Sequence, residues 1–132
     1  MTRAPAPLAV LLVLAAACAR PEPPDATYRA LVAAARARDA DRAWGLLSST
    51  TQAWLDARAK AAAARAPGVV APSGKELLVA GSGGARPPRS IVALRESADR
   101  AVLQITDDQG AAREVTLVRE GRWRVELPEP SR

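Results

Sequence analysis

The chain has 132 residues, which is enough for one domain with a core of its own. Apolar residues make up 48% of it and charged residues 25%, so the composition is that of a folded protein and excludes a disordered or fibrous chain. The net charge of +5 comes from basic residues scattered singly among acidic ones, and this distribution argues against a nucleic-acid partner.

Residues 1–17 are typical of a signal peptide. Arg3 supplies the positive start, and an unbroken apolar run covers residues 8–17. This run is too short to cross a bilayer, which takes about 20 residues, but it suits the apolar region of a signal peptide. We therefore expect residues 1–17 to be removed during export.

The only cysteine of the chain, Cys18, directly follows this run. The sequence Leu14-Ala15-Ala16-Ala17-Cys18 resembles the lipobox of bacterial lipoproteins, in which the cysteine receives a diacylglycerol group and becomes the mature N-terminus. The family usually has Leu three places before the cysteine, where this chain has Ala15. An ordinary secreted protein cleaved after the three alanines is the alternative interpretation.

The resemblance implies that two or three acyl chains on Cys18 anchor the mature protein stably in a membrane. An Asp directly after the cysteine commonly retains such proteins in the inner membrane, and this chain has Ala19 there. The resemblance therefore favours the outer membrane, facing the periplasm. We interpret residues 18–24 as the lipidated cysteine with a proline-rich tether, and residues 25–132 as a single domain.

Two helices are predicted at the start of this domain. From Asp25 an apolar stripe has the spacing of a helix, and its members are Tyr28, Leu31, Val32 and Ala35. A second, short helix is predicted around Trp44 and Leu47, with Asp39 or Asp41 as its N-cap.

A third helix is predicted from the capping-box spacing of Ser49 and Gln52 to about Ala64, where a Pro-Gly pair soon follows. The same spacing recurs over residues 73–76 and predicts a short fourth helix up to Ala80, although a strand is the alternative there. The glycine-rich residues that follow predict a flexible loop.

From Ser90 onward, apolar and polar residues alternate with a period of two. Strand-length runs cover residues 91–96, 101–106, 112–119 and 122–127, and short polar connections join them as in hairpins. One face is expected to be buried, because apolar residues alternate with polar ones at Val115, Leu117, Trp123, Val125 and Leu127. Helices packed on a curved antiparallel meander define an α+β fold.

Two motifs carry a resemblance. Residues 38–48 contain an acidic helix end followed by Trp44-Gly45-Leu46-Leu47-Ser48, and residues 115–125 contain a hairpin with Glu-Gly-Arg-Trp at its turn. Over residues 25–127 the chain resembles lipoproteins related to the nuclear transport factor 2 superfamily. The resemblance implies a cone-shaped domain able to hold a ligand between helices and sheet. Some members of the superfamily are isomerases or dehydratases.

Several chemistries are excluded. The chain has no histidine, and its one cysteine is expected to be acylated, so no set of zinc or other transition-metal ligands exists and His-dependent nucleophiles are impossible. Asp107 and Asp108 are interpreted as a polar hairpin rather than a calcium loop. Residues 81–84 are interpreted as a flexible loop, because no Lys-Ser/Thr pair follows them as in a phosphate-binding loop. We expect no cofactor and no metal.

An isomerase of this superfamily would need a buried carboxylate base and hydrogen-bond donors to the developing oxyanion. Tyr28 or a tryptophan could donate. The acidic candidates on the strands are expected to face solvent, because they alternate with inward-facing residues: Glu96, Glu114 and Glu126.

The possible pocket-lining residues are Tyr28, Trp44 and Trp54, but the two tryptophans are interpreted first as core fillers in a chain with few large side chains. Two functions remain open. The first is a membrane-anchored envelope lipoprotein with a non-catalytic binding or scaffolding domain for an envelope protein, glycan or lipid. The alternative is an isomerase- or dehydratase-like enzyme that uses the cone pocket. A carboxylate pointing into the cone beside Tyr28 or a tryptophan would favour the enzyme.

Overall fold

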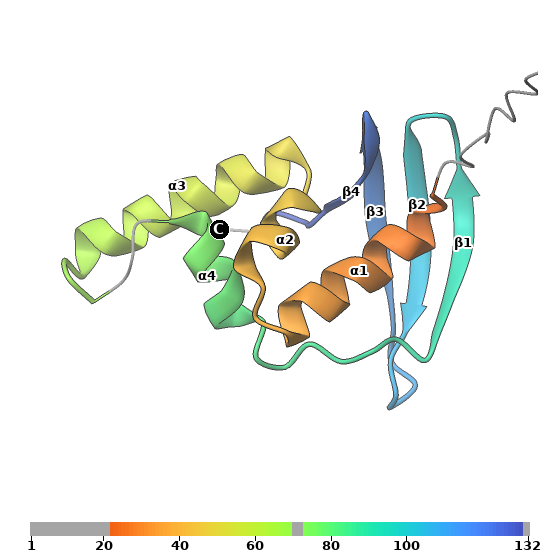
Figure 1. Cartoon of the computed structure of the whole chain (residues 1–132), viewed down its shortest axis with the longest axis horizontal. Coiled ribbons are helices and arrows are strands. Elements are labelled where there is room, and N and C mark those ends of the chain that lie inside the picture. The colour runs from red at the N-terminus through yellow and green to blue at the C-terminus, as the bar shows by residue number, and fades with distance from the viewer. Residues whose placement is uncertain (1–21, 70–72, 131–132) are drawn as a thin grey trace, which may run out of the picture.

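The computed structural model describes residues 22–69 and 73–130. The helices come first along the chain: α1 (Pro24–Arg36), α2 (Ala40–Gly45), α3 (Ser49–Arg65) and α4 (Gly74–Gly81). The strands follow: β1 (Ser90–Glu96), β2 (Arg100–Thr106), β3 (Ala112–Glu120) and β4 (Arg122–Glu126). This order confirms the α+β class (Figure 1). The expected signal peptide and Cys18 lie outside the described residues.

Helix α1 packs against the sheet through one side. It starts with Pro24 in its first turn, where a missing backbone N–H costs no helical hydrogen bond. Val32 and Ala35, predicted to lie on its buried stripe, are only half-buried. The stripe is instead rotated, and its buried members are Pro24, Thr27, Tyr28, Leu31 and Ala34.

Helices α2 and α3 are capped by side chains. Of the two predicted caps for α2, Asp39 is confirmed: its Oδ1 accepts from the backbone N–H of Arg42 at 3.2 Å. The predicted Ser49–Gln52 capping box of α3 is wrong. The N-cap is Ser48, one residue earlier, and its Oγ accepts from the backbone N–H of Thr51 at 3.2 Å.

The helical interpretation of residues 75–80 is confirmed, because they lie within α4. Ser73 does not cap this helix with its side chain. Instead Asp56 Oδ1, from α3, accepts from the backbone N–H of Gly74 at 2.8 Å, which ties the start of α4 to its neighbour. Lys75 bonds Asp41 of α2 at 2.7 Å, and this hydrogen bond and the lysine's charge hold the pKa of Asp41 below its ordinary value of 3.8.

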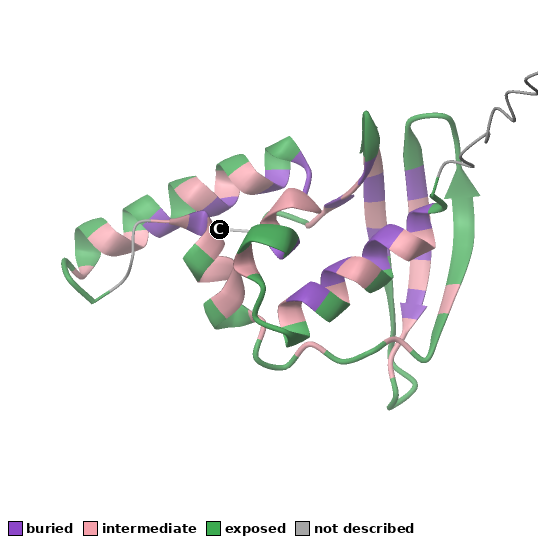
Figure 2. Ribbon diagram, viewed as in Figure 1, coloured by how far each residue is buried: buried purple, intermediate pink, exposed green. Residues whose placement is uncertain are grey.

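The four strands form one antiparallel sheet in the order β1-β2-β3-β4. Burial alternates along β2, β3 and β4, as Figure 2 shows, while β1 is exposed along most of its length. The buried strand residues are Ala101, Leu103, Ile105, Val115, Leu117, Trp123 and Val125. The predicted buried face is therefore confirmed, with Leu127 half-buried at its end.

The two motifs that carry the family resemblance contact each other. Residues 46–48 run beside the free edge of β4: Val125 donates its N–H to the carbonyl of Leu46, and Ser48 donates its N–H to the carbonyl of Val125, each at 2.8 Å. The two motifs therefore serve packing, by covering one edge of the sheet.

Charged side chains at the β3–β4 turn complete this contact. Glu120 accepts from the N–H and Oγ of Ser49 at the start of α3, at 3.1 and 2.9 Å. Arg122 and Arg124 both donate to the carbonyl of Gly45 at the end of α2, at 2.9 and 2.7 Å. A carboxylate at a helix N-terminus and guanidinium groups at a helix C-terminus both complement the helix dipole.

Within residues 22–69 and 73–130, no helix combines the length and the apolar character that a membrane crossing requires.

Candidate functional site

A cavity of about 550 Å³ lies where residues 82–89 pass α1 and the end of the sheet. Helix α1 contributes Tyr28, and β2 and β3 contribute Ile105 and Arg113. Arg86 from the loop and Asp107 from the β2–β3 turn complete the charged lining. The volume falls in the range of about 300–1,000 Å³ that is usual for small-molecule sites.

Tyr28 is held between α1 and the sheet, with 3% of its surface exposed. Arg113 Nη2 donates a hydrogen bond to the Tyr28 hydroxyl. Because a guanidinium has no acceptor, the hydroxyl's own hydrogen points elsewhere and stays able to donate. The Tyr28–Arg113 pair therefore presents a phenol O–H and guanidinium N–H groups as hydrogen-bond donors at the cavity.

Arg113 lies opposite Ile105 in the sheet, on the side that α1 covers. It precedes Val115 by two residues and so lies on the same face of β3, although Arg113 itself is exposed at the end of that face. The sequence analysis missed Arg113 and Arg86. Val115 and Leu117 were predicted to share one face of β3 because they alternate with polar residues. Continuing this alternation two residues towards the start of the strand would have placed Arg113 on the same face.

The carboxylate that borders this cavity belongs to Asp107. Its Oδ1 accepts from the backbone N–H groups of Gln109 and Ala111, each at 2.9 Å. Asp107 thus closes the β2–β3 turn, as its interpretation as a polar hairpin predicted. Both hydrogen bonds use Oδ1, so this oxygen is engaged by the turn itself. Its neighbour Asp108 pairs with Arg86 at 3.3 Å in an exposed position.

The structure does not bring the three predicted pocket residues together. Trp44 and Trp54 were predicted to fill the core, but both are half-buried and pack against the buried cluster without belonging to it. Trp54 borders two other hollows, one with Arg58 and Glu129 and one on the opposite side of β3 and β4. Only Tyr28 lines the cavity described above.

The strand carboxylates lie away from Tyr28. Glu96 and Glu114 are exposed, and Glu126 is half-buried and accepts from Arg100 at 3.3 Å. The alternation behind this expectation fails in β1, where an irregularity between residues 93 and 95 places Glu96 opposite Ala101. None of the three borders the Tyr28 cavity.

In the described part of the chain, no group of three or more His, Cys, Asp or Glu residues is close enough to hold a metal ion. Comparison of the chain with protein-family profiles, with curated proteins and with solved structures gave no match. The cavity offers guanidinium and phenol hydrogen-bond donors together with apolar side chains. These are the groups expected in a binding site for a negatively charged group.

Proposed function

We propose that the protein is a membrane-anchored envelope lipoprotein whose single domain binds a partner without catalysis. The lipobox-like residues before Cys18 support the anchor, and helices packed on one face of an antiparallel sheet are compatible with a cone of the nuclear transport factor 2 type. The acyl chains on Cys18 contact the membrane, and an envelope protein, glycan or lipid is the partner class. Neither nucleic acid nor metal takes part.

The observation that carries the binding role is the cavity beside Tyr28. A tyrosine and an arginine from elements far apart in the chain present donors there, while the lining carboxylate, Asp107, is already held by the β2–β3 turn. This arrangement supports binding over the alternative, an isomerase or dehydratase, because none of the strand carboxylates Glu96, Glu114 and Glu126 borders the cavity to serve as the base of such a reaction.

Membrane fractionation tests the anchor. The full chain and its Cys18→Ser variant are produced in a Gram-negative bacterium, and membranes are washed with high salt. We expect the parent chain to sediment and the variant to be soluble. A variant that still sediments after the wash would contradict lipid anchoring.

A second substitution tests the choice of membrane. Ala19→Asp introduces the residue that commonly retains lipoproteins in the inner membrane. We expect it to move the protein from the outer to the inner membrane fraction. An unchanged outer-membrane fraction, or a parent chain already in the inner membrane, would contradict the proposed location.

A further inference from the structure

We infer that the cavity beside Tyr28 binds a small organic anion, with a carboxylate head at the Arg113–Tyr28 pair and a short apolar body along the opposite wall. This rests on the proposed binding role and names its ligand class. Three features lead to it: an arginine without a carboxylate partner, a tyrosine hydroxyl fixed beside it, and apolar groups in the wall.

One arginine of the cavity has no carboxylate partner. Arg113 forms no ion pair with any described carboxylate, and its guanidinium bonds only to the neutral Tyr28 hydroxyl. Arg86 is paired with Asp108, but both side chains are more than half exposed, so this ion pair is weak and can be exchanged for a ligand. Asp107 is the acidic residue in the lining, and its Oδ1 faces the backbone of its own turn.

The Tyr28 hydroxyl is held in place before any ligand binds. Tyr28 is buried up to its hydroxyl, so the position of that oxygen is set by the packing of α1 on the sheet. Arg113 is bonded to it, and the remaining N–H groups of the guanidinium and the phenol hydrogen stay available. Charge-assisted hydrogen bonds from a guanidinium suit the two oxygens of a carboxylate, and a donor that is already ordered loses less entropy on binding.

The rest of the wall combines apolar side chains with the polar Ser82 and Gln109. Pro88 and Ala85 from the loop face the same cavity as Ile105 and Ala112 from the sheet. A fully hydrated anion such as inorganic phosphate gains nothing from these groups, whereas a short hydrocarbon chain loses water against them. The combination therefore favours an organic carboxylate over a mineral anion.

Ligand binding at the cavity can be followed by NMR through Tyr28, because it is the only tyrosine of the chain. Labelling the mature lipoprotein with 3-fluorotyrosine gives one ¹⁹F signal at the cavity. In a non-ionic detergent, sodium hexanoate should shift this signal and saturate, while hexanamide, which has the same body without the charge, should bind about tenfold more weakly or not at all.

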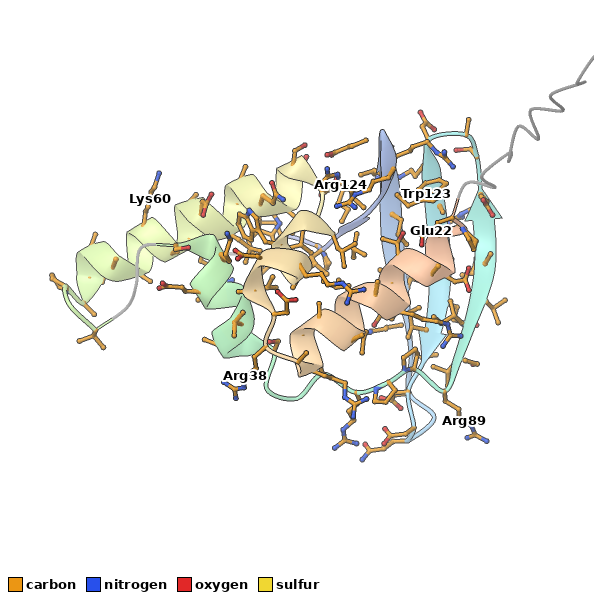
Figure 3. The ribbon with its side chains drawn as sticks, viewed as in Figure 1. Glu22, Arg38, Lys60, Arg89, Trp123 and Arg124 are labelled. Carbon is orange, nitrogen blue, oxygen red and sulfur yellow. The ribbon has the colours of Figure 1, made fainter. Side chains whose placement is uncertain are left out.

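Variants identify the residues involved. Arg113→Gln should weaken hexanoate binding about tenfold or more, and Arg86→Gln should weaken it less, because Arg86 is already paired. Arg89→Gln is the matched control: Arg89 is exposed and extends away from the end of the sheet (Figure 3), so its loss should leave binding unchanged. Tryptophan fluorescence verifies that each variant is folded. If Arg113→Gln does not fold, the Arg86→Gln variant and the comparison of hexanoate with hexanamide still test whether the cavity binds an organic anion.

Three results would overturn the inference: no saturable shift with hexanoate, equal binding of hexanoate and hexanamide, or saturation by phosphate but not by hexanoate. The membrane fractionation of Cys18→Ser is independent of all three. A Cys18→Ser variant that still sediments with membranes would refute the lipoprotein proposal even if hexanoate binds, whereas a parent chain that is anchored but does not bind hexanoate would refute the ligand class.

Discussion

Two buried hydroxyl groups join the start of α3 to the chain that follows β4. Ser48 Oγ and Thr51 Oγ1 lie 2.9 Å apart, and both residues are fully buried. Thr51 Oγ1 also accepts from the backbone N–H of Leu127 at 3.0 Å. Removing a hydroxyl here leaves a buried backbone donor unpaired, which costs about 1–3 kcal/mol.

Thr51→Val therefore should lower the free energy of unfolding by about 1–3 kcal/mol, although it preserves the shape of the side chain. Thr50→Val, the same change at the exposed neighbouring residue, should alter it by less than about 0.5 kcal/mol. Urea unfolding followed by tryptophan fluorescence measures both. Equal losses in the two variants would show that the hydroxyl pair is not what stabilises this junction.

Glu120 acts at the same junction by its charge. It bonds the N–H and Oγ of Ser49 at the first turn of α3, where a negative charge is favourable. Glu120→Gln should destabilise the protein by about 0.3–1 kcal/mol at low ionic strength, and by less in high salt. Glu114→Gln, on the exposed part of β3, is the control and should have no such salt-dependent effect.

At the level of elements, α4 approaches α3 closely enough to require a glycine. A Cβ on Gly74 would lie 2.7 Å from the backbone nitrogen of Asp56 and 2.8 Å from the carbonyl carbon of Leu55. The hydrogen bond from Gly74 to Asp56 depends on this approach. At the other end of the helix, a Cβ on Gly81 would meet nothing within 4 Å.

Gly74→Ala should therefore push α4 away from α3 and destabilise the protein by about 1–3 kcal/mol, which is the usual cost of overpacking. Gly81→Ala should be neutral or slightly stabilising, because alanine favours a helix over glycine. The midpoints of thermal unfolding of the two variants and of the parent protein measure this difference in stability. A Gly74→Ala protein as stable as the parent would refute the close contact between the helices.

The order of helices and strands was predictable because both periods are written locally in the sequence. The helical spacing of apolar residues around Leu31 can be recognised within one short stretch of sequence. The alternation of apolar and polar residues around Leu117 can be recognised in the same way. The capping of α3 by Ser48 rather than Ser49 was not predictable in this way, because Glu120, 71 residues away, takes Ser49 as its partner. The Tyr28–Arg113 pair likewise joins residues 85 positions apart.

For the whole molecule, Trp123 connects the sheet to the helices. It lies on the buried side of β4 (Figure 3) with 3% of its surface exposed. The guanidinium carbon of Arg119 lies 4.5 Å from the centre of the Trp123 ring. The adjacent Arg124 points to the other side of the strand but is not free, since it donates to the carbonyl of Gly45. Trp123 is therefore a core residue, as its alternation with Arg124 predicted.

Trp123→Ala should remove about 3–5 kcal/mol, a large part of a total stability of about 5–15 kcal/mol, and leave the domain largely unfolded. Val92→Ala on the exposed strand β1 should cost less than about 0.5 kcal/mol. Circular dichroism in increasing urea distinguishes them. A well-folded Trp123→Ala protein would contradict the register of β4.

The anchor and the cavity lie close together along the chain. Only nine residues separate Cys18 from Tyr28, and a fully extended stretch from Cys18 to Pro23 spans at most about 20 Å. A lipid on Cys18 would therefore keep the domain near the membrane surface. The proposed function depends on that covalent modification.

The mass of the mature protein isolated from the envelope tests this directly. We predict a chain that begins at Cys18 and carries a thioether-linked diacylglycerol, with an additional acyl group on its amino group. Export as an ordinary secreted protein would use the same cleavage site. A chain that begins at Cys18 with an unmodified thiol, or one that retains residues 1–17, would contradict the account.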